Sequence, residues 1–393
     1  MEQYDGSLKG EHGTGRNMAP FVDAEWGSVA ANIMRRLKNL VDPDDLLNPG
    51  VIINADPRAH LNHLKDLPLV AEEVDKCMEC GYCEARCPSR DLTLTPRQRI
   101  NVLREMKRLE NVPGEREMAA SLRDDFSYMG LDTCAVDGLC ALSCPVGIDT
   151  GALTKRLRGE SHSPIARRGA ELLASHIGWV ESALRVALRT GHFAQSVAGA
   201  DLVNLLIRAG RVLTRQPLPL WSPDLPYAAS SRSLRAGKKS NAQAVYFPSC
   251  ISRVMGLLPG ELHDFSLAQV FVTVAVRAGL SLFIPDDVQG TCCGIPFSSK
   301  GYELAHRIAV NRSIERFWNW SDEGRMPIVI DTSPCTYGLL TSWSQLEPQN
   351  QYRLESMRII DMWPLRMTIC CPASRSKRSS AQSLCIQFVR SRK

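Results

Sequence analysis

Four cysteines within eleven residues constrain this chain more than any other feature. Residues 77–88 read Cys77-Met-Glu-Cys80-Gly-Tyr-Cys83-Glu-Ala-Arg-Cys87-Pro88. This C-x2-C-x2-C-x3-C-P spacing is the one with which a bacterial-type loop binds a cubane iron–sulfur cluster, the fourth cysteine usually serving a neighbouring cluster. A zinc site or a disulfide staple is the alternative, but zinc ligands normally come as two separated pairs. The spacing therefore predicts an iron–sulfur cluster and a role in electron transfer.

A second cysteine motif follows, with one substitution. Residues 134–145 read Cys134-Ala-Val-Asp137-Gly-Leu-Cys140-Ala-Leu-Ser-Cys144-Pro145, so Asp137 stands where the second cysteine would be. Crossed ligation would give two ligand sets, with Cys77, Cys80, Cys83 and Cys144 on the first cluster and Cys87, Cys134 and Cys140 on the second. The second cluster would be [3Fe–4S], or [4Fe–4S] with an oxygen ligand from Asp137. The third alternative is a degenerate site in which Asp137 is an ordinary turn residue.

The segment between the two motifs has helical patterning. Residues 96–109 and 115–125 carry strong helix formers at helical spacing. An insert of this length resembles the α-helical ferredoxin module of succinate dehydrogenase iron–sulfur subunits and of heterodisulfide-reductase partners. That resemblance implies two clusters of [4Fe–4S] or [3Fe–4S] type within residues 58–160.

Composition narrows the class of protein further. Eleven of the 14 cysteines fall in the metal-type motifs, and no signal peptide is seen, so a secreted disulfide scaffold is not expected. The net charge of +5 arises from residues 366–393, which hold seven Lys or Arg and no acid, so no nucleic-acid partner is expected. No apolar run is long enough to span a bilayer. We expect a cytoplasmic protein, with a peripheral position at the inner membrane face as an open alternative.

Two short segments near the amino terminus carry a different kind of signal. Gly10-Glu11-His12-Gly13-Thr14-Gly15-Arg16 is a glycine-rich turn with an acid and an imidazole, which can bind metal or move protons. Asp23 is predicted to cap a helix whose apolar face is formed by Ala24, Val29, Ile33, Leu37 and Leu40. The helix should end before Asp42-Pro43, and Asn48-Pro49-Gly50 should form a turn.

Together these segments resemble the carboxy-terminal end of FAD-linked oxidases of the vanillyl-alcohol-oxidase type, and especially D-2-hydroxyacid dehydrogenases fused to iron–sulfur modules. The resemblance implies that Glu11 helps to hold a divalent metal, that His12 lies beside the flavin as a catalytic residue, and that Asn48 closes over the FAD. It covers about the first 55 residues. The family's FAD-binding subdomain would lie upstream of Met1, so FAD is expected in the intact parent protein.

The carboxy-terminal half alternates strands and helices. Residues 164–214 read as two basic amphipathic helices, with Leu172, Leu173, Ile177, Val180 and Leu184 on one stripe, and residues 217–233 mark a boundary. Strands are predicted at 244–250, 280–284 and 327–331, and helices at 262–278 and 300–318. This alternation predicts a parallel α/β sheet with cysteines at the carboxyl ends of its strands.

The cysteines of this half, two of which form the Cys292-Cys293-Gly294 motif, resemble those in the first half of a heterodisulfide-reductase B type cysteine-rich module. The resemblance implies a metal or cluster site formed by Cys250, Cys292, Cys293 and Cys335. The family's Cys-x-x-Cys ending is missing at Cys335, which puts one ligand in doubt. Four buried structural cysteines are the alternative.

The expected architecture is a multidomain α+β protein. Its parts are an FAD-linked oxidase remnant (1–57), an α-helical ferredoxin module (58–160), a helical connector (161–240), an α/β cysteine-rich module of the Cys-Cys-Gly type (241–364) and an aberrant tail (365–393). Acids vanish from that tail and regular patterning stops, which suggests a shifted reading frame, so Cys370, Cys371 and Cys385 are expected to bind nothing specific.

The expected function is the iron–sulfur relay of a flavin-dependent D-2-hydroxyacid dehydrogenase. It would pass electrons from the reduced FAD of an upstream flavin domain to an acceptor, either a quinone or a carrier protein. One alternative is a free-standing iron–sulfur subunit of the glycolate oxidase or anaerobic glycerol-3-phosphate dehydrogenase type. The other is the non-functional product of a broken gene.

Overall fold

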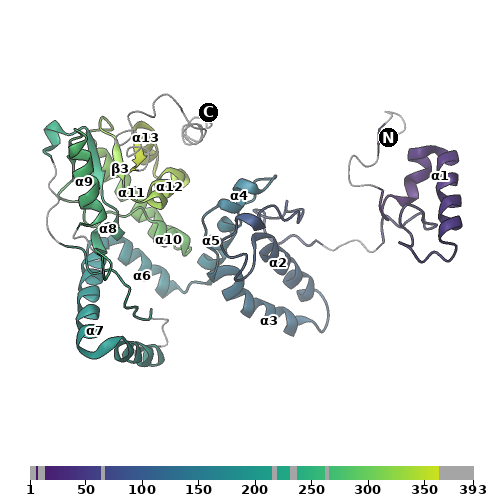
Figure 1. Ribbon diagram of the computed structural model, residues 1–393, viewed down its shortest axis with the longest axis horizontal. Coiled ribbons are helices and arrows are strands. Elements are labelled where there is room, and N and C mark those ends of the chain that lie inside the picture. Colours follow the sequence, from purple (N-terminus) through teal and green to yellow (C-terminus); the bar gives the residue numbers. More distant parts are fainter. Residues whose placement is uncertain are drawn as a thin grey trace. The chain divides into compact units, whose positions relative to one another are not determined.

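The computed structural model describes residues 6–7, 14–62, 67–214, 219–230, 237–261 and 265–362. The chain forms two compact units, one comprising residues 1–75 and 99–124 and the other residues 76–98 and 125–393. Within the described residues the fold is mixed helical with one small parallel sheet (Figure 1). The predicted tail from residue 365, and the side chains of Glu11 and His12, lie outside the described residues.

The amino-terminal segment is built around one kinked helix. A 3-10 turn, Ala19–Phe21, leads into α1, Val22–Val41, which contains a non-helical glycine at Gly27 (φ 78°). The predicted cap at Asp23 is wrong, because the preceding 3-10 turn starts the helix earlier and leaves Asp23 in its first turn. An acid there still interacts favourably with the positive end of the helix dipole. The apolar face itself is exposed, with Val29 and Leu40 at 75% and 81%.

The end of α1 matches its prediction. Asp42 follows the helix, and its carboxylate accepts hydrogen bonds from Leu46 N (2.9 Å) and Leu47 N (2.8 Å). A side-chain bond from Lys38 and these two backbone bonds lower the Asp42 pKa to about 2. The same carboxylate therefore ends the helix and folds the chain into the turn at Asn48, whose φ of 47° is left-handed.

Helices lie between and after the two cysteine motifs along the chain. A 3-10 turn, Glu84–Arg86, lies inside the first motif and is followed by α2, Pro96–Glu110, and α3, Arg116–Phe126, which confirms both predicted helices within one residue. A π-helical segment, Ser127–Asp132, leads to the second motif, which contains α4, Leu139–Ser143. Helix α5, Thr150–Ser161, follows directly, with Asp149 as its N-cap.

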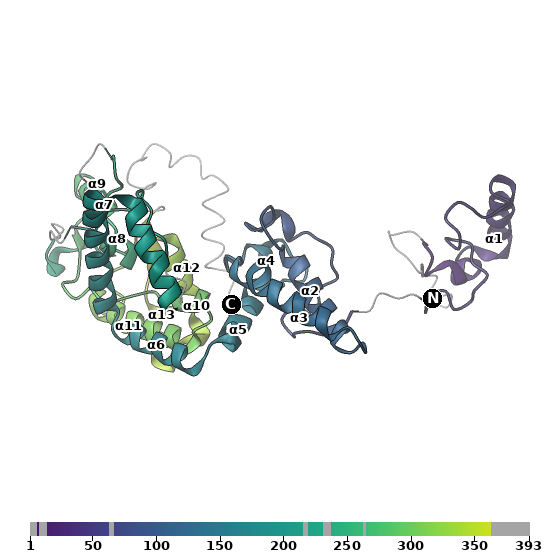
Figure 2. The ribbon, with the colours of Figure 1, turned by 90° about the horizontal axis from the view of Figure 1, so that it is seen from below.

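Two further helices connect this region to the sheet. They are α6, Pro164–Ser175, and α7, Ile177–Thr214, which is kinked at Gly199. The predicted stripe is only partly buried, since Leu172 is 63% exposed. Helix α6 instead buries Ala170 and Ala174 against Ala305 of α11 (Figure 2), because small side chains let two helices approach closely.

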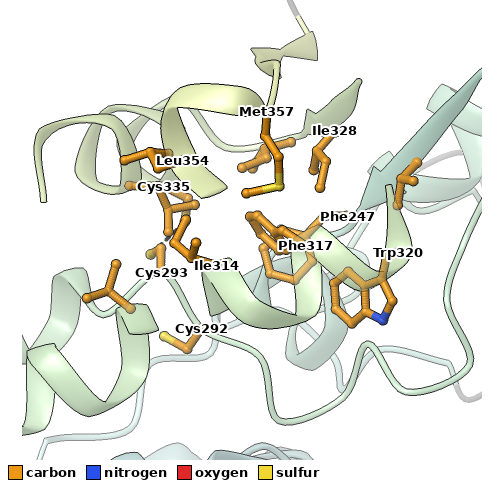
Figure 3. Packing of buried hydrophobic residues seen from close by; sticks show 14 of the residues in the cluster. Phe247, Cys292, Cys293, Ile314, Phe317, Trp320, Ile328, Cys335, Leu354 and Met357 are labelled. Carbon is orange, nitrogen blue, oxygen red and sulfur yellow. Dashed lines mark hydrogen bonds between the residues drawn. The ribbon is translucent and has the colours of Figure 1, made fainter. Parts of the chain in front are cut away.

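The sheet has four parallel strands in the order β2-β1-β3-β4. They are β1, Ala244–Phe247; β2, Leu282–Phe283; β3, Ile328–Ile330; and β4, Ile359–Asp361. Alternate side chains of β1 face opposite sides, as the two-residue period of a strand requires. Tyr246 packs against α9, whereas Val245 and Phe247 pack against Ile314 and Phe317 of α11 (Figure 3).

Helices cover both faces of the sheet. Helix α9, Leu267–Arg277, covers one face, and α11, Glu303–Trp320, α12, Ser333–Thr341, and α13, Pro348–Ser356, contribute to the core on the other. Two short helices, α8, Cys250–Val254, and α10, Ile295–Ser299, lie in the loops. Two 3-10 turns complete the fold, at Lys239–Asn241 and Trp343–Gln345. The predicted parallel arrangement is confirmed, and β4 was not predicted.

Among the described helices, none combines the length and the apolar character that a membrane span needs.

Candidate functional site

The four cysteines of the first cysteine loop, residues 77–88, are buried to different extents. Cys80 is exposed, Cys77 and Cys83 are half-buried, and Cys87 is buried. The turn around it is held by Glu84, whose carboxylate accepts from Thr95 Oγ1 (2.7 Å) and from Arg97 Nε (3.0 Å). The start of α2 is thereby fixed against the loop.

Cys83 lies where the two cysteine loops meet. Burial raises the pKa of the Cys83 thiol to about 11, and a hydrogen bond from the Arg97 backbone N–H opposes this shift. Electrostatic interaction with Cys140 and Cys77 raises the pKa further. Arg97 is in the first turn of α2, so the free N–H groups and positive end of that helix face the sulfur. Cys140 was assigned to the other ligand set by crossed ligation; the structure brings it towards Cys83 and Cys77.

Cys140, in the second cysteine loop (residues 134–145), has a similar environment. Its thiol is buried, which raises its pKa, and backbone N–H groups of Thr150 and Gly151 at the start of α5 counter that shift. Thr150 Oγ1 lies 3.2 Å from the sulfur and Asp149 Oδ1 lies 3.8 Å from it. These two residues were missed by the sequence analysis. An Asp directly before a helix is an N-cap signal that could have indicated the helix start.

Asp137, the predicted oxygen ligand, is exposed. Its Oδ1 accepts a hydrogen bond from Leu139 N (3.1 Å) at the start of α4. This is the local geometry of an Asx turn. A carboxylate has a second oxygen, so the turn bond and a ligand role are compatible. A second carboxylate, that of Asp149, lies near the residue that follows Asp137. Its Oδ2 would be 3.8 Å from a Cβ atom placed on Gly138.

Four sulfurs come together at the carboxyl ends of β1 and β3. Cys293 Sγ lies 3.1 Å from Cys335 Sγ (Figure 3). Cys292 in turn interacts with both Cys293 and Cys250. The interaction with Cys292 is the main cause of the raised pKa of Cys250. Cys292, Cys293 and Cys335 are buried. The structure thus gathers the four residues that the sequence analysis grouped.

The strand ends that carry these cysteines are held by a buried carboxylate. Asp331, directly after β3, accepts from Tyr246 Oη (2.9 Å) and from Ser249 N (2.9 Å). Ser249 caps α8, and its hydroxyl also contacts Thr332 Oγ1 at 2.8 Å. The loops before Cys250 and Cys335 are therefore tied to each other across the two strands.

A buried ion pair holds the other side of this cysteine cluster. Arg253 pairs with Glu181 of α7, the two side chains being 9% and 3% exposed. The same guanidinium donates to the Pro248 carbonyl and, at 2.7 Å, to the Thr291 carbonyl. Arg253 therefore joins the loop before Cys250 to the loop before Cys292. Sequence reasoning missed it because its partners lie 38 and 72 residues away.

The donor chemistry fits iron–sulfur clusters better than a single ion. Within the described residues, no three His, Cys, Asp or Glu side chains converge on one metal-ion position. A zinc ion requires every sulfur ligand at about 2.3 Å from one point. In a cubane each thiolate binds its own iron, so sulfurs that are spread around a larger volume suit it. Backbone N–H groups at Cys83, Cys140 and Cys292 would hydrogen-bond to ligand sulfurs.

The two amino-terminal segments also come together. Ile52 N donates to the Gly15 carbonyl at 3.0 Å, and Arg16 Nη2 donates to the Pro49 carbonyl at 3.1 Å. The described end of the glycine-rich segment therefore lies beside the turn that carries Asn48. Asn48 is exposed.

Comparison with protein families matches two parts of the chain. Residues 1–52 match the family "FAD linked oxidases, C-terminal domain", and residues 73–148 match the "4Fe-4S dicluster domain". The chain therefore joins a segment similar to FAD-linked oxidases to a segment similar to iron–sulfur dicluster domains. These matches support iron–sulfur clusters as its cofactors, FAD in the parent protein and a role in iron–sulfur electron transfer. The second match includes both cysteine loops.

Curated relatives agree with this combination. The chain is 27% identical over 217 residues to D-2-hydroxyglutarate dehydrogenase of Pantoea ananatis, covering 42% of this chain and 21% of the relative. It is 41% identical over 49 residues to the mitochondrial cytochrome-type D-lactate dehydrogenase of Arabidopsis thaliana, covering 12% and 9%. The chain thus spans about a fifth or less of either relative. No solved structure is significantly similar to it.

Proposed function

We propose that this chain is the iron–sulfur relay of a flavin-dependent D-2-hydroxyacid dehydrogenase. The observation that carries the proposal is the meeting of the two cysteine loops, where Cys83 and Cys140 each face the start of a helix. A segment similar to FAD-linked oxidases precedes them in the same chain. A free-standing iron–sulfur subunit would not need that segment, which disfavours the glycolate oxidase and anaerobic glycerol-3-phosphate dehydrogenase alternatives.

In this proposal the chain's own residues hold and orient the redox groups. The first set is Cys77, Cys80, Cys83 and Cys144, the second is Cys87, Cys134, Cys140 and Asp137, and the third is Cys250, Cys292, Cys293 and Cys335. Clusters, when bound, would supply the capacity to accept and release single electrons, and FAD would supply the hydride chemistry. Backbone N–H groups at the helix starts would stabilise the thiolates.

The amino-terminal segment would complete the flavin site. Glu11 would help to hold a divalent metal, and His12 and Asn48 would lie beside the FAD. The exposed apolar face of α1 supports a flavin-domain partner, since contiguous apolar surface of this kind marks interaction sites. The acceptor would be a quinone or a carrier protein.

Replacing Cys80 tests the relay. Cys80 is exposed, so Cys80→Ser should leave the fold intact. We expect anaerobically purified Cys80→Ser protein to lose the electron paramagnetic resonance signal of one reduced cubane. The matched control is Cys385→Ser, the same substitution at a position expected to bind nothing, and it should keep that signal. Wild-type iron content and spectrum in Cys80→Ser would contradict the proposal.

A further inference from the structure

A buried arginine attaches the start of the second cysteine loop to the cysteine-rich sheet region. Arg158, near the end of α5, is 7% exposed. Its guanidinium donates to the carbonyl oxygens of Leu131, Asp132 (3.2 Å) and Cys134 (2.9 Å). It also donates to the carbonyl of Ser299, at the end of α10. One side chain thereby joins the start of the second loop to Ser299, which lies 141 residues after Arg158 in the chain.

The backbone approaches closely beside this arginine. A Cβ placed on Gly159 would lie 2.7 Å from the Gly301 carbonyl oxygen, and one placed on Gly301 would lie 2.5 Å from Gly159 N. The next residues continue the contact. The His162 ring stacks on Tyr302 with centroids 4.0 Å apart and planes 5° apart, and its Nε2 lies 2.7 Å from the Lys300 carbonyl. These contacts leave little room for α5 to move against residues 299–302.

The other side of the same loop reaches the helix that carries Cys335. A Cβ placed on Gly138 would lie 3.6 Å from Tyr337 Oη, and Tyr337 is two residues beyond Cys335 in α12. The second cysteine loop is therefore bounded at Cys134 by Arg158 and at Gly138 by Tyr337. Because Arg158 holds the backbone at Cys134, it also holds the distance between Cys134 and the sulfurs at the strand ends.

We propose that Arg158 is a positioning residue that locks the second cysteine loop onto the cysteine-rich sheet region, so that the two redox sites assigned there keep one fixed separation. This inference rests on the proposed function. Arg158 acts through the loop backbone and is not a ligand.

Amide hydrogen exchange on the apo-protein tests the lock without any cluster. We compare Arg158→Met and Arg158→Lys with Arg156→Met, a matched control on the same helix whose arginine pairs at the surface with Glu160. In Arg158→Met, exchange at residues 131–134 and at 299–302 should accelerate together, by at least about tenfold, since bonds from a charged donor are lost on both sides. Arg158→Lys should accelerate both less, because an ammonium retains charge but has a smaller reach. The control should change neither.

Redox titration of the loaded protein provides the second readout. The midpoint potential of the second-loop cluster should shift in Arg158→Met, because hydrogen bonds and solvent exposure around a cluster set its potential and both change when the loop loosens. It should keep most of its wild-type value in Arg158→Lys and be unchanged in Arg156→Met. Exchange that accelerates on one side only, or a potential in Arg158→Met equal to that of the wild type, would overturn the inference. Failure of the wild type to bind any cluster would contradict the proposed function instead, and the exchange result on the apo-protein would still decide the lock.

Discussion

Two helical glycines on neighbouring helices provide a matched test of the contact between α5 and the turn at residue 301. Alanine is favoured over glycine in a helix by about 1 kcal/mol. At Gly169 of α6 nothing lies within 4 Å of a new Cβ, so Gly169→Ala should stabilise the protein by about that amount. At Gly159 the new carbon would lie 2.7 Å from the Gly301 carbonyl oxygen, a backbone atom that cannot rotate away.

The difference between the two variants isolates the cost of that contact. The helix preference is common to both and cancels, which leaves an overpacking penalty of about 1–3 kcal/mol against Gly159→Ala. Urea denaturation of both apo-proteins under reducing conditions, followed by the shift in midpoint at constant slope, measures it. Equal stability of Gly159→Ala and Gly169→Ala would refute the close approach, and with it the rigid attachment of the second cysteine loop.

Two further outcomes follow from the sites. Asp137→Cys should convert the second site into a four-thiolate cluster with the resonance of an ordinary cubane. Asp137→Asn, which keeps the hydrogen bond to Leu139 N, should not. An unchanged spectrum in Asp137→Cys would show that another residue, such as Asp149, completes the site. Burial lowers the pKa of His306 to about 4 from 6.5, so the neutral form stabilises the fold fully above about pH 6.5 and this contribution is lost as the pH falls towards 4. The loss amounts to about 3 kcal/mol, and His306→Leu should flatten the stability profile over that range; a profile as steep as that of the wild type would contradict it.

Local patterns in the sequence predicted much of the fold. The helices at 96–109 and 115–125 were predicted within one residue, because propensity and apolar spacing agree there. The strand predicted at 244–250 begins as expected but ends at Phe247, because Ser249 caps the short helix α8. The start of α1 was predicted two residues late because Asp23 resembles a cap, whereas a 3-10 turn that contains Pro20 precedes the helix. Strand β4 has three half-buried residues, and so short an element carries little periodicity.

The residues of the candidate sites also divide into those that sequence patterns predicted and those that only the fold brings together. Cysteine spacing gave the candidates in the two loops, because three ligands of one cluster can share a single tight loop. Cys250, Cys292, Cys293 and Cys335 are far apart in sequence and were grouped by resemblance to a known module. The residues that orient those loops could not be read from spacing. Arg158 reaches a carbonyl 141 residues away and Arg253 reaches a carboxylate 72 residues away. Buried arginines of this kind are recognised only when the fold brings their acceptors together, since an isolated arginine is usually a surface residue.

The metal content of the wild-type protein, purified without oxygen, tests the central claim most directly. The account predicts a brown protein that contains about four iron and four acid-labile sulfide per chain for each cubane, with further iron from the second site and negligible zinc. Stoichiometric zinc without iron would contradict it and would make the two cysteine loops structural zinc ligands instead.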